Sequence, residues 1–191
     1  LEPRRFEEAV GVLARGMRDN PLHVAAYGEP AERRLRCHGR LMSGLFAAFP
    51  AQQPIGAVLE GRLVGVTGVG PPGRCQPTPV QAMRVAPRAL SLGPRTAARI
   101  GRWTSRWSAL DPDEPHAHLG PLAVDAHLQG QGIGSLIMRE HCRRLDASRQ
   151  LGYLETDKRE NVTFYERFGY AVAHTEPVLG VPNWFMRREP G

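Results

Sequence analysis

The chain has 191 residues and a formal net charge of +6, a length that fits one compact domain. No apolar run approaches the roughly 20 residues needed to cross a bilayer, and residues 1–5 lack the apolar stretch of a signal peptide, so we expect no membrane partner. Lys158 is the only lysine among 25 basic residues, and the arginines are spread along the chain beside acids. A nucleic-acid-binding face needs clustered cations, so we expect no nucleic-acid partner.

Hydrophobic periodicity and turn residues predict the elements in chain order. They are a helix over 6–18, a helix over 31–49, strands over 55–59 and 63–69, a long Pro- and Gly-rich loop over 70–95, a helix over 96–109, a strand over 118–124, a helix that ends near 148, a strand over 152–156, a helix over 161–168, and strands over 170–176 and 184–188. Asp19-Asn20-Pro21 ends the first helix, and Gly169 ends the last. This order predicts a mixed α/β sheet.

Cysteine usage bears on the compartment. Cys37, Cys75 and Cys142 are odd in number, widely spaced and form no C-x-x-C pair. This usage argues against a disulfide framework and is typical of a reducing environment. We therefore expect a cytoplasmic protein.

The segment from His118 to Ser135 leads an apolar strand into glycines that open a helix. Backbone N–H groups at a helix start lie at the positive end of the helix dipole without partners inside the helix, so such a turn can bind a phosphate. A dinucleotide fingerprint fails because Ser135 occupies its third glycine position and too few residues follow, although Glu155 stands where its acidic residue is expected. A P-loop fails because no Gly-Lys-Ser/Thr follows. A glycine-rich turn without a ligand stays open.

The remaining interpretation is the motif Q-x-x-G-x-G, with Gln129, Gly132 and Gly134 in the fixed positions. A second block follows it, with Leu154-Glu-Thr and then Asn161-Val-Thr-Phe-Tyr-Glu-Arg-Phe-Gly-Tyr. Together the two blocks resemble the GCN5-related N-acetyltransferase (GNAT) superfamily, whose acetyl-CoA pyrophosphate loop has the form of the first block.

Within that superfamily, the chain is most similar to the puromycin N-acetyltransferase-like subgroup. The similarity lies in the second block, in Asn183-Trp-Phe-Met-Arg, and in a helical insert that carries Trp103 and Trp107. The resemblance implies an α/β GNAT acyl-CoA N-acyltransferase fold, with a mixed, mostly antiparallel sheet splayed at its fourth and fifth strands and flanked by helices. It implies a single N-acetyltransferase domain over 1–191, with its first strand at or before Leu1 and a loop plus helical insert over 70–110.

The resemblance also implies an acetyl-CoA site on the glycine-rich segment. The backbone of Leu122, Ala123 and Val124 would pair with the pantetheine arm as an added strand does, although the side chains of Leu122 and Val124 are also typical of a core. The pyrophosphate would lie on a run of consecutive residues, namely Gln129, Gly130, Gln131, Gly132, Ile133, Gly134 and Ser135. Asn161 would contact the cofactor arm, unless it caps its helix instead.

Tyr165 lies four residues after Asn161 and therefore on the same helix face. The resemblance implies that its phenol protonates the departing CoA thiolate, which suits a pKa near 10 against about 8.5 for a thiol; a buried core tyrosine is the alternative. The acceptor amine must react unprotonated. His118 and Glu155, on neighbouring strands, are both candidate bases, and a water relay is the third option.

The acceptor pocket should lie opposite the cofactor. Candidate lining residues, from the first helices, the insert and the last hairpin, are Asn20, Phe46, Trp103 and Trp184. Aromatic residues at helical spacing are also typical of a core.

A metal site is the weaker hypothesis. His116-Ala-His118 follows Asp111, Asp113 and Glu114, but no further ligand pattern supports this spacing. We therefore expect no metal.

The sequence predicts an N-acetyltransferase that transfers an acetyl group from acetyl-CoA, its co-substrate, directly to a primary amine of a small molecule. We expect a monomer or a homodimer. Acetylation of a peptide or protein amine is one alternative, and a non-catalytic acyl-CoA sensor is the other.

Overall fold

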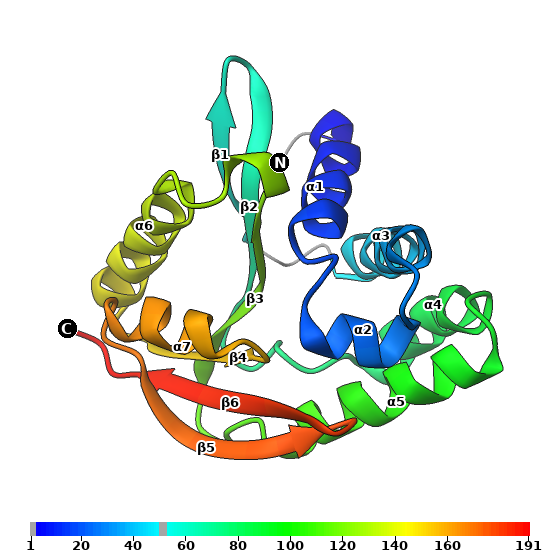
Figure 1. Cartoon of the computed structure of the whole chain (residues 1–191). Helices are drawn as coiled ribbons and strands as arrows, with labels where there is room; N and C mark the ends of the chain where they lie inside the picture. The colour runs from blue at the N-terminus through cyan, green and yellow to red at the C-terminus, as the bar shows by residue number, and fades with distance from the viewer. Residues whose placement is uncertain (1–2, 50–52) are drawn as a thin grey trace.

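The computed structural model describes residues 3–49 and 53–191. Its elements, labelled in Figure 1, are α1 (Pro3–Gly16), α2 (Pro21–Tyr27), α3 (Ala31–Ala48), β1 (Ile55–Leu59), β2 (Arg62–Gly70), α4 (Pro79–Leu90), α5 (Pro94–Ala109), β3 (His116–Val124), a 3₁₀ turn (Ala126–Leu128), α6 (Ile133–Ser148), β4 (Leu151–Thr156), α7 (Arg159–Glu166), β5 (Ala171–Val178) and β6 (Val181–Arg188). Within these ranges, no helix combines the length and apolar character that a membrane span requires.

The six strands form one sheet in the order β1-β2-β3-β4-β6-β5. Neighbouring strands are antiparallel except β3 and β4, which run parallel and pair only over His116–His118 and Leu151–Tyr153. Beyond His118 the two strands separate. This confirms a mixed, mostly antiparallel sheet with a splay. In the described sheet the splay lies between β3 and β4. The strand expected at or before Leu1 lies outside the described residues; counting it makes β3 and β4 the fourth and fifth strands.

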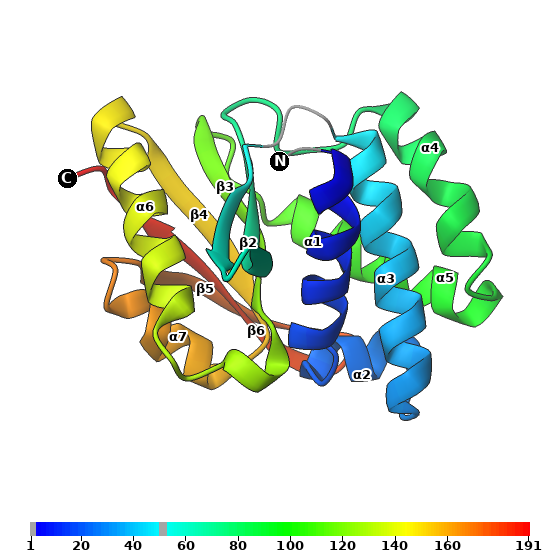
Figure 2. The ribbon, with the colours of Figure 1, turned by 90° about the horizontal axis from the view of Figure 1, so that it is seen from above.

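The sheet separates two hydrophobic cores, because successive residues of a strand point to opposite faces. On β4, Tyr153 packs with α1, α2, α3 and α5, whereas Leu154 packs with α6 and α7. On β6, Phe185 and Met186 divide in the same way. Figure 2 shows the resulting layers, with α1 to α5 on one side of the sheet and α6 and α7 on the other.

Helix α4 corrects the expectation of a loop over 70–95. Thr78 and Gln81 form a capping box, in which the Thr78 hydroxyl accepts from the Gln81 N–H at 3.3 Å and the Gln81 side chain accepts from the Thr78 N–H at 2.9 Å. Pro79 follows in the first turn, where a missing N–H costs nothing. Proline density predicted a break here, but Pro79 begins a helix.

Helix α2 is a second element that sequence periodicity did not predict. Pro21, interpreted only as the end of the preceding helix, is also the first residue of this one. Seven residues are too few to show a helical repeat, and four of them are buried, namely Leu22, His23, Ala26 and Tyr27. The helix is therefore held by tertiary packing, as short helices generally are.

Candidate active site

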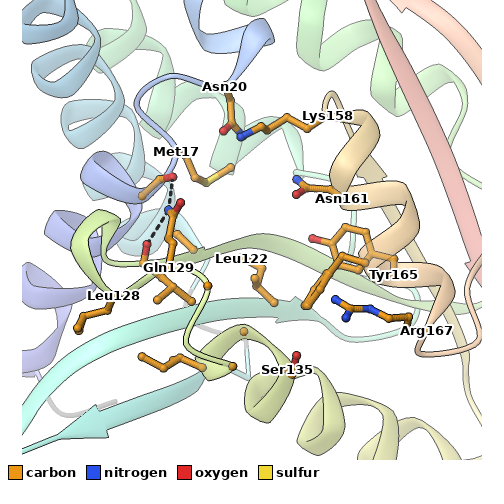
Figure 3. A pocket seen from close by; sticks show the side chains of 18 residues that line it. Met17, Asn20, Leu122, Leu128, Gln129, Ser135, Lys158, Asn161, Tyr165 and Arg167 are labelled. Atoms are coloured by element: carbon orange, nitrogen blue, oxygen red, sulfur yellow. Dashed lines mark hydrogen bonds between the residues drawn. The ribbon is translucent and has the colours of Figure 1, made fainter.

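A cavity of about 370 Å³ lies where β3, the glycine-rich turn and α7 meet (Figure 3). It is lined by every residue predicted to bind the cofactor except Gln131, namely Leu122, Ala123, Val124, Gln129, Gly130, Gly132, Ile133, Gly134, Ser135 and Asn161. We call it the first cavity.

The glycine-rich turn depends on left-handed backbone. Gly130 has φ 80° and Gly132 has φ 83°, a conformation that glycine adopts without strain. Gly132 is also the N-cap of α6 and has no capping side chain. The N–H groups of the first turn of α6 are therefore left for an anion in the first cavity.

Gln129 holds this turn in place. Its side-chain amide nitrogen donates to the carbonyl of Gly16 at 3.0 Å and to that of Val124 at 3.1 Å, as Figure 3 shows. Gly16 itself lies so close to β3 that a Cβ there would be 2.4 Å from the Val124 oxygen. The Gln129 side chain therefore fastens the turn to α1 and β3, a structural contact that sequence reasoning did not foresee.

Two cations, Lys158 and Arg167, also line the first cavity. The sequence analysis did not include them. They lie at the two ends of α7, close in the chain to Asn161 and Tyr165, and this closeness was the signal from which they could have been predicted. Positive charge at this rim suits a ligand that carries phosphate groups.

Helix α7 carries Asn161 and Tyr165 into the first cavity. Lys158 is the N-cap of α7, and Asn161 lies within the helix and donates to the Thr156 hydroxyl at 3.1 Å, so the alternative that Asn161 caps the helix is wrong. Tyr165 is only 7% exposed. Burial, and then the charge of Asp157, raise the pKa of its phenol, which therefore keeps its proton at neutral pH.

A second cavity of about 240 Å³ adjoins the first from the other side. The two cavities share five lining residues, Met17, Asn20, Leu122, Asn161 and Tyr165. Most of the remaining lining is apolar or aromatic, with Leu22, His23, His38, Leu41, Met42, Leu45, Trp103, Trp107, Leu119, Pro121 and Leu154 among its residues. Tyr165 therefore stands at the junction of a polar cavity and a mainly apolar one.

Of the four predicted acceptor residues, Asn20 and Trp103 line the second cavity, and Phe46 and Trp184 are not among its described lining residues. Phe46 packs beside Phe6, with ring centroids 6.0 Å apart. Trp184 faces the core beneath α7, because it alternates with neighbours on β6 that face the other core.

The two candidate bases form one pair at the wall of the second cavity. His118 Nε2 lies 2.8 Å from Glu155 Oε2, and both residues also line an outer cavity of about 590 Å³ that begins beside α4. Asp111, predicted from sequence only as a weak candidate metal ligand near His118, has Oδ1 3.3 Å from His118 Nδ1. Burial disfavours the charged imidazole, but Glu155 and Asp111 outweigh it and raise the pKa of His118 to about 10.

Comparison with known proteins agrees with this geometry. Residues 98–172, which run from α5 into β5, match the family model of the acetyltransferase (GNAT) domain. The match covers 75 of the 191 residues and identifies a GNAT acetyltransferase domain in this part of the chain; proteins of this family use an acyl-CoA donor.

Solved structures share the fold of this GNAT acetyltransferase at low sequence identity. A histone acetyltransferase HPA2-related protein from Corynebacterium glutamicum is 20% identical with a TM-score of 0.76, over 100% of this chain and 94% of that one. Polyamine N-acetyltransferase from Drosophila melanogaster is 17% identical with a TM-score of 0.67, over 99% and 97%. Ribosomal-protein-S18-alanine N-acetyltransferase from Escherichia coli is 13% identical with a TM-score of 0.54, over 99% and 90%.

Proposed function

We propose that this GNAT acetyltransferase transfers an acetyl group from acetyl-CoA directly to a primary amine of a small molecule with an apolar or aromatic body. The observation that carries the proposal is the meeting of the two cavities at Tyr165. The first cavity suits the phosphates and pantetheine of CoA, and the second suits the acceptor. Both are lined from elements spread along the chain, which supports one N-acetyltransferase domain over 1–191.

Bond formation and cleavage follow from this arrangement. The amine nitrogen attacks the thioester carbonyl from the second cavity, the C–N bond forms, and the C–S bond breaks. The phenol of Tyr165 gives its proton to the departing CoA thiolate and recovers one from solvent. No covalent intermediate on the enzyme is needed, because donor and acceptor meet directly.

Glu155 is the residue we assign to take the proton of the amine. It lies at the wall of the second cavity and is held by His118 Nε2 at 2.8 Å. His118 then positions Glu155, and the two candidate bases of the sequence analysis have different roles. Positioned proton transfer of this kind contributes typically about 10²–10⁴-fold to rate.

The lining of the second cavity narrows the acceptor class. His38 Nε2 and Trp103 Nε1 are buried and have no hydrogen-bond partner within residues 3–49 and 53–191, although both residues line the cavity. A buried donor left unpaired costs about 1–3 kcal/mol, so an acceptor with an oxygen on its apolar body would satisfy Trp103. The resemblance of residues 154–170 to the puromycin N-acetyltransferase-like subgroup also supports a small-molecule acceptor.

The test is release of CoA thiol from acetyl-CoA across an amine panel of phenethylamine, tyramine, agmatine, spermidine, free amino acids and an N-terminal peptide. We expect turnover with the two arylalkylamines and the highest kcat/KM with tyramine. Selective turnover of the peptide would instead identify a peptide N-acetyltransferase. Acetyl-CoA binding by calorimetry without thiol release from any amine would identify an acyl-CoA sensor.

A further inference from the structure

Metal-ligating side chains from separate segments gather behind the His118–Glu155 pair. Cys75, His116 and His118 bring one ligand atom each within 4.8 Å of one another, and so do Asp111, His118 and Glu155. Cys75 lies in the loop after β2 and Asp111 in the loop before β3, and the two triads share His118.

Three atoms of this cluster are buried without a hydrogen-bond partner among residues 3–49 and 53–191, namely Asp111 Oδ1, His116 Nε2 and His118 Nδ1. The side chains of Asp111 and His116 are only 9% and 4% exposed. Asp111 Oδ1 lies 3.2 Å from His116 Nε2 and 3.3 Å from His118 Nδ1, yet neither contact meets the geometry of a hydrogen bond. These are ion-pair distances when the imidazoles are protonated, and with neutral imidazoles the same three atoms are left without a hydrogen-bond partner.

Two of their separations, from Asp111 Oδ1 to each histidine nitrogen, are close to the edge length of a metal tetrahedron. Nitrogen and oxygen ligands lie about 2.0–2.2 Å from Zn²⁺, so neighbouring ligand atoms of a tetrahedral site are about 3.3–3.6 Å apart. The two separations of 3.2 and 3.3 Å lie at the short end of this range. The Cys75 thiol, within 4.8 Å of a ring nitrogen of each histidine, is the available fourth ligand.

Each histidine has its second ring nitrogen held. His116 Nδ1 lies 2.9 Å from the Glu114 carbonyl, and His118 Nε2 lies 2.8 Å from the Glu155 carboxylate. Metal-ligating histidines almost always donate their other N–H to a carbonyl or carboxylate in this way. The contacts leave His116 Nε2 and His118 Nδ1 for the metal.

We propose that Cys75, His116 and His118, with Asp111 beside the two histidines, bind one Zn²⁺ ion. Imidazole and thiolate ligands in a tetrahedral set select zinc over magnesium or calcium. No metal was predicted from sequence, because only the segment from Asp111 to His118 brings candidate ligands together in one stretch of chain. If the proposed function holds, the ion fixes the His118 tautomer that faces Glu155, but zinc binding itself does not depend on that function.

The first test is calorimetric titration of the chelator-treated protein with ZnCl₂, with metal content measured by mass spectrometry. We expect one equivalent of zinc per chain, and at least tenfold weaker binding by Asp111→Asn and His116→Gln. The matched controls Cys142→Ser and His127→Gln, which change residues outside the cluster, should bind zinc as the parent does. No stoichiometric binding by the parent protein, or equal binding by the ligand variants, overturns the proposal.

The second test uses Co²⁺ as a spectroscopic probe in the same protein. Tetrahedral Co²⁺ should give visible absorption bands and a thiolate-to-metal band in the near ultraviolet, and Cys75→Ser should lose the latter. Absence of that band in the parent protein overturns the assignment of Cys75. Zinc should also raise the melting temperature of the parent protein, because it binds the folded chain; an unchanged melting temperature counts against the site even if a variant fails to fold. None of these readouts needs acetyl transfer, so this proposal and the proposed function can fail separately.

Discussion

The two cavities differ in how the chain builds them. The first is made largely of one contiguous stretch from 122 to 135 and one helix, and its glycine-rich turn offers backbone N–H groups. The second is made of side chains from α2, α3, α5, β3 and β4, which are far apart in sequence. Under the proposed function, the acyl-CoA donor would be bound by local backbone geometry, whereas the acceptor would be bound by side chains that tertiary packing brings together.

The largest expected effect comes from Tyr165, where the two cavities meet. Tyr165→Phe removes the proposed proton donor and should lower kcat at least about tenfold, within the range for general acid catalysis, with little change in acetyl-CoA affinity. Steady-state kinetics with the best amine and calorimetry with acetyl-CoA measure the two quantities.

Tyr170→Phe is the matched control for Tyr165→Phe and should leave kcat unchanged. Its hydroxyl bonds His141 at 2.8 Å in the core, and neither cavity is lined by Tyr170. An unchanged kcat in Tyr165→Phe would remove the phenol from the mechanism.

His141, in the core beneath α6, should make the stability of the fold depend on pH. Burial, then Arg188 and Arg144, lower the pKa of its imidazole to about 4, against about 6.5 in the unfolded chain. The unfolded state therefore binds more protons between these values, and the stabilising contribution is lost as pH falls from about 6.5 towards 4. The free energy of unfolding in urea should be about 2 kcal/mol lower at pH 5 than at pH 7 because of this residue. The His141→Gln variant should lack this part of the pH difference. An equal pH response in the variant would contradict this assignment.

Gly132 tests the cofactor side alone. A side chain at φ 83° strains the turn that presents the N–H groups, so Gly132→Ala should raise the KM for acetyl-CoA about tenfold, equivalent to about 1.4 kcal/mol, and leave the KM for the amine unchanged. Gly61 in the β1–β2 turn has φ 79°, and at both glycines the position of an added Cβ has no atom within 4 Å. Gly61→Ala should therefore cost similar stability without the KM effect. An equal KM in both variants would separate the turn from cofactor binding.

Trp103 tests the acceptor side and has the smallest expected effect. Trp103→Phe removes the unpaired N–H and should lower the preference for tyramine over phenethylamine about threefold, the worth of a hydrogen bond of under 1 kcal/mol. The ratio of the two kcat/KM values isolates this term from general loss of packing. Trp184→Phe, on the opposite core, should leave the ratio unchanged, and a similar drop in both variants would contradict the assignment.

The same contrast explains what could be predicted from sequence. The Gln129–Gly134 motif lies on one short stretch of chain, so its resemblance to the GNAT loop was enough to imply the fold and most of the residues of the first cavity, although not Lys158 or Arg167. The second cavity could be predicted only in part: Asn20 and Trp103 line it, but α2 is too short to show periodicity and Trp184 faces the opposite core. Cys75 approaches His118 only through tertiary structure, so its position in the chain carries no signal, and the spacing from Asp111 to His118 was too weak a pattern without it.

The most direct test of the account is the affinity of a bisubstrate compound in which phenethylamine is joined to CoA through the acetyl carbon. If the two cavities meet at Tyr165, one molecule fills both, and linking the two binding events should strengthen binding by at least about 100-fold over CoA alone. Calorimetry measures this ratio. A conjugate that binds no tighter than CoA would show that the second cavity does not receive the acceptor.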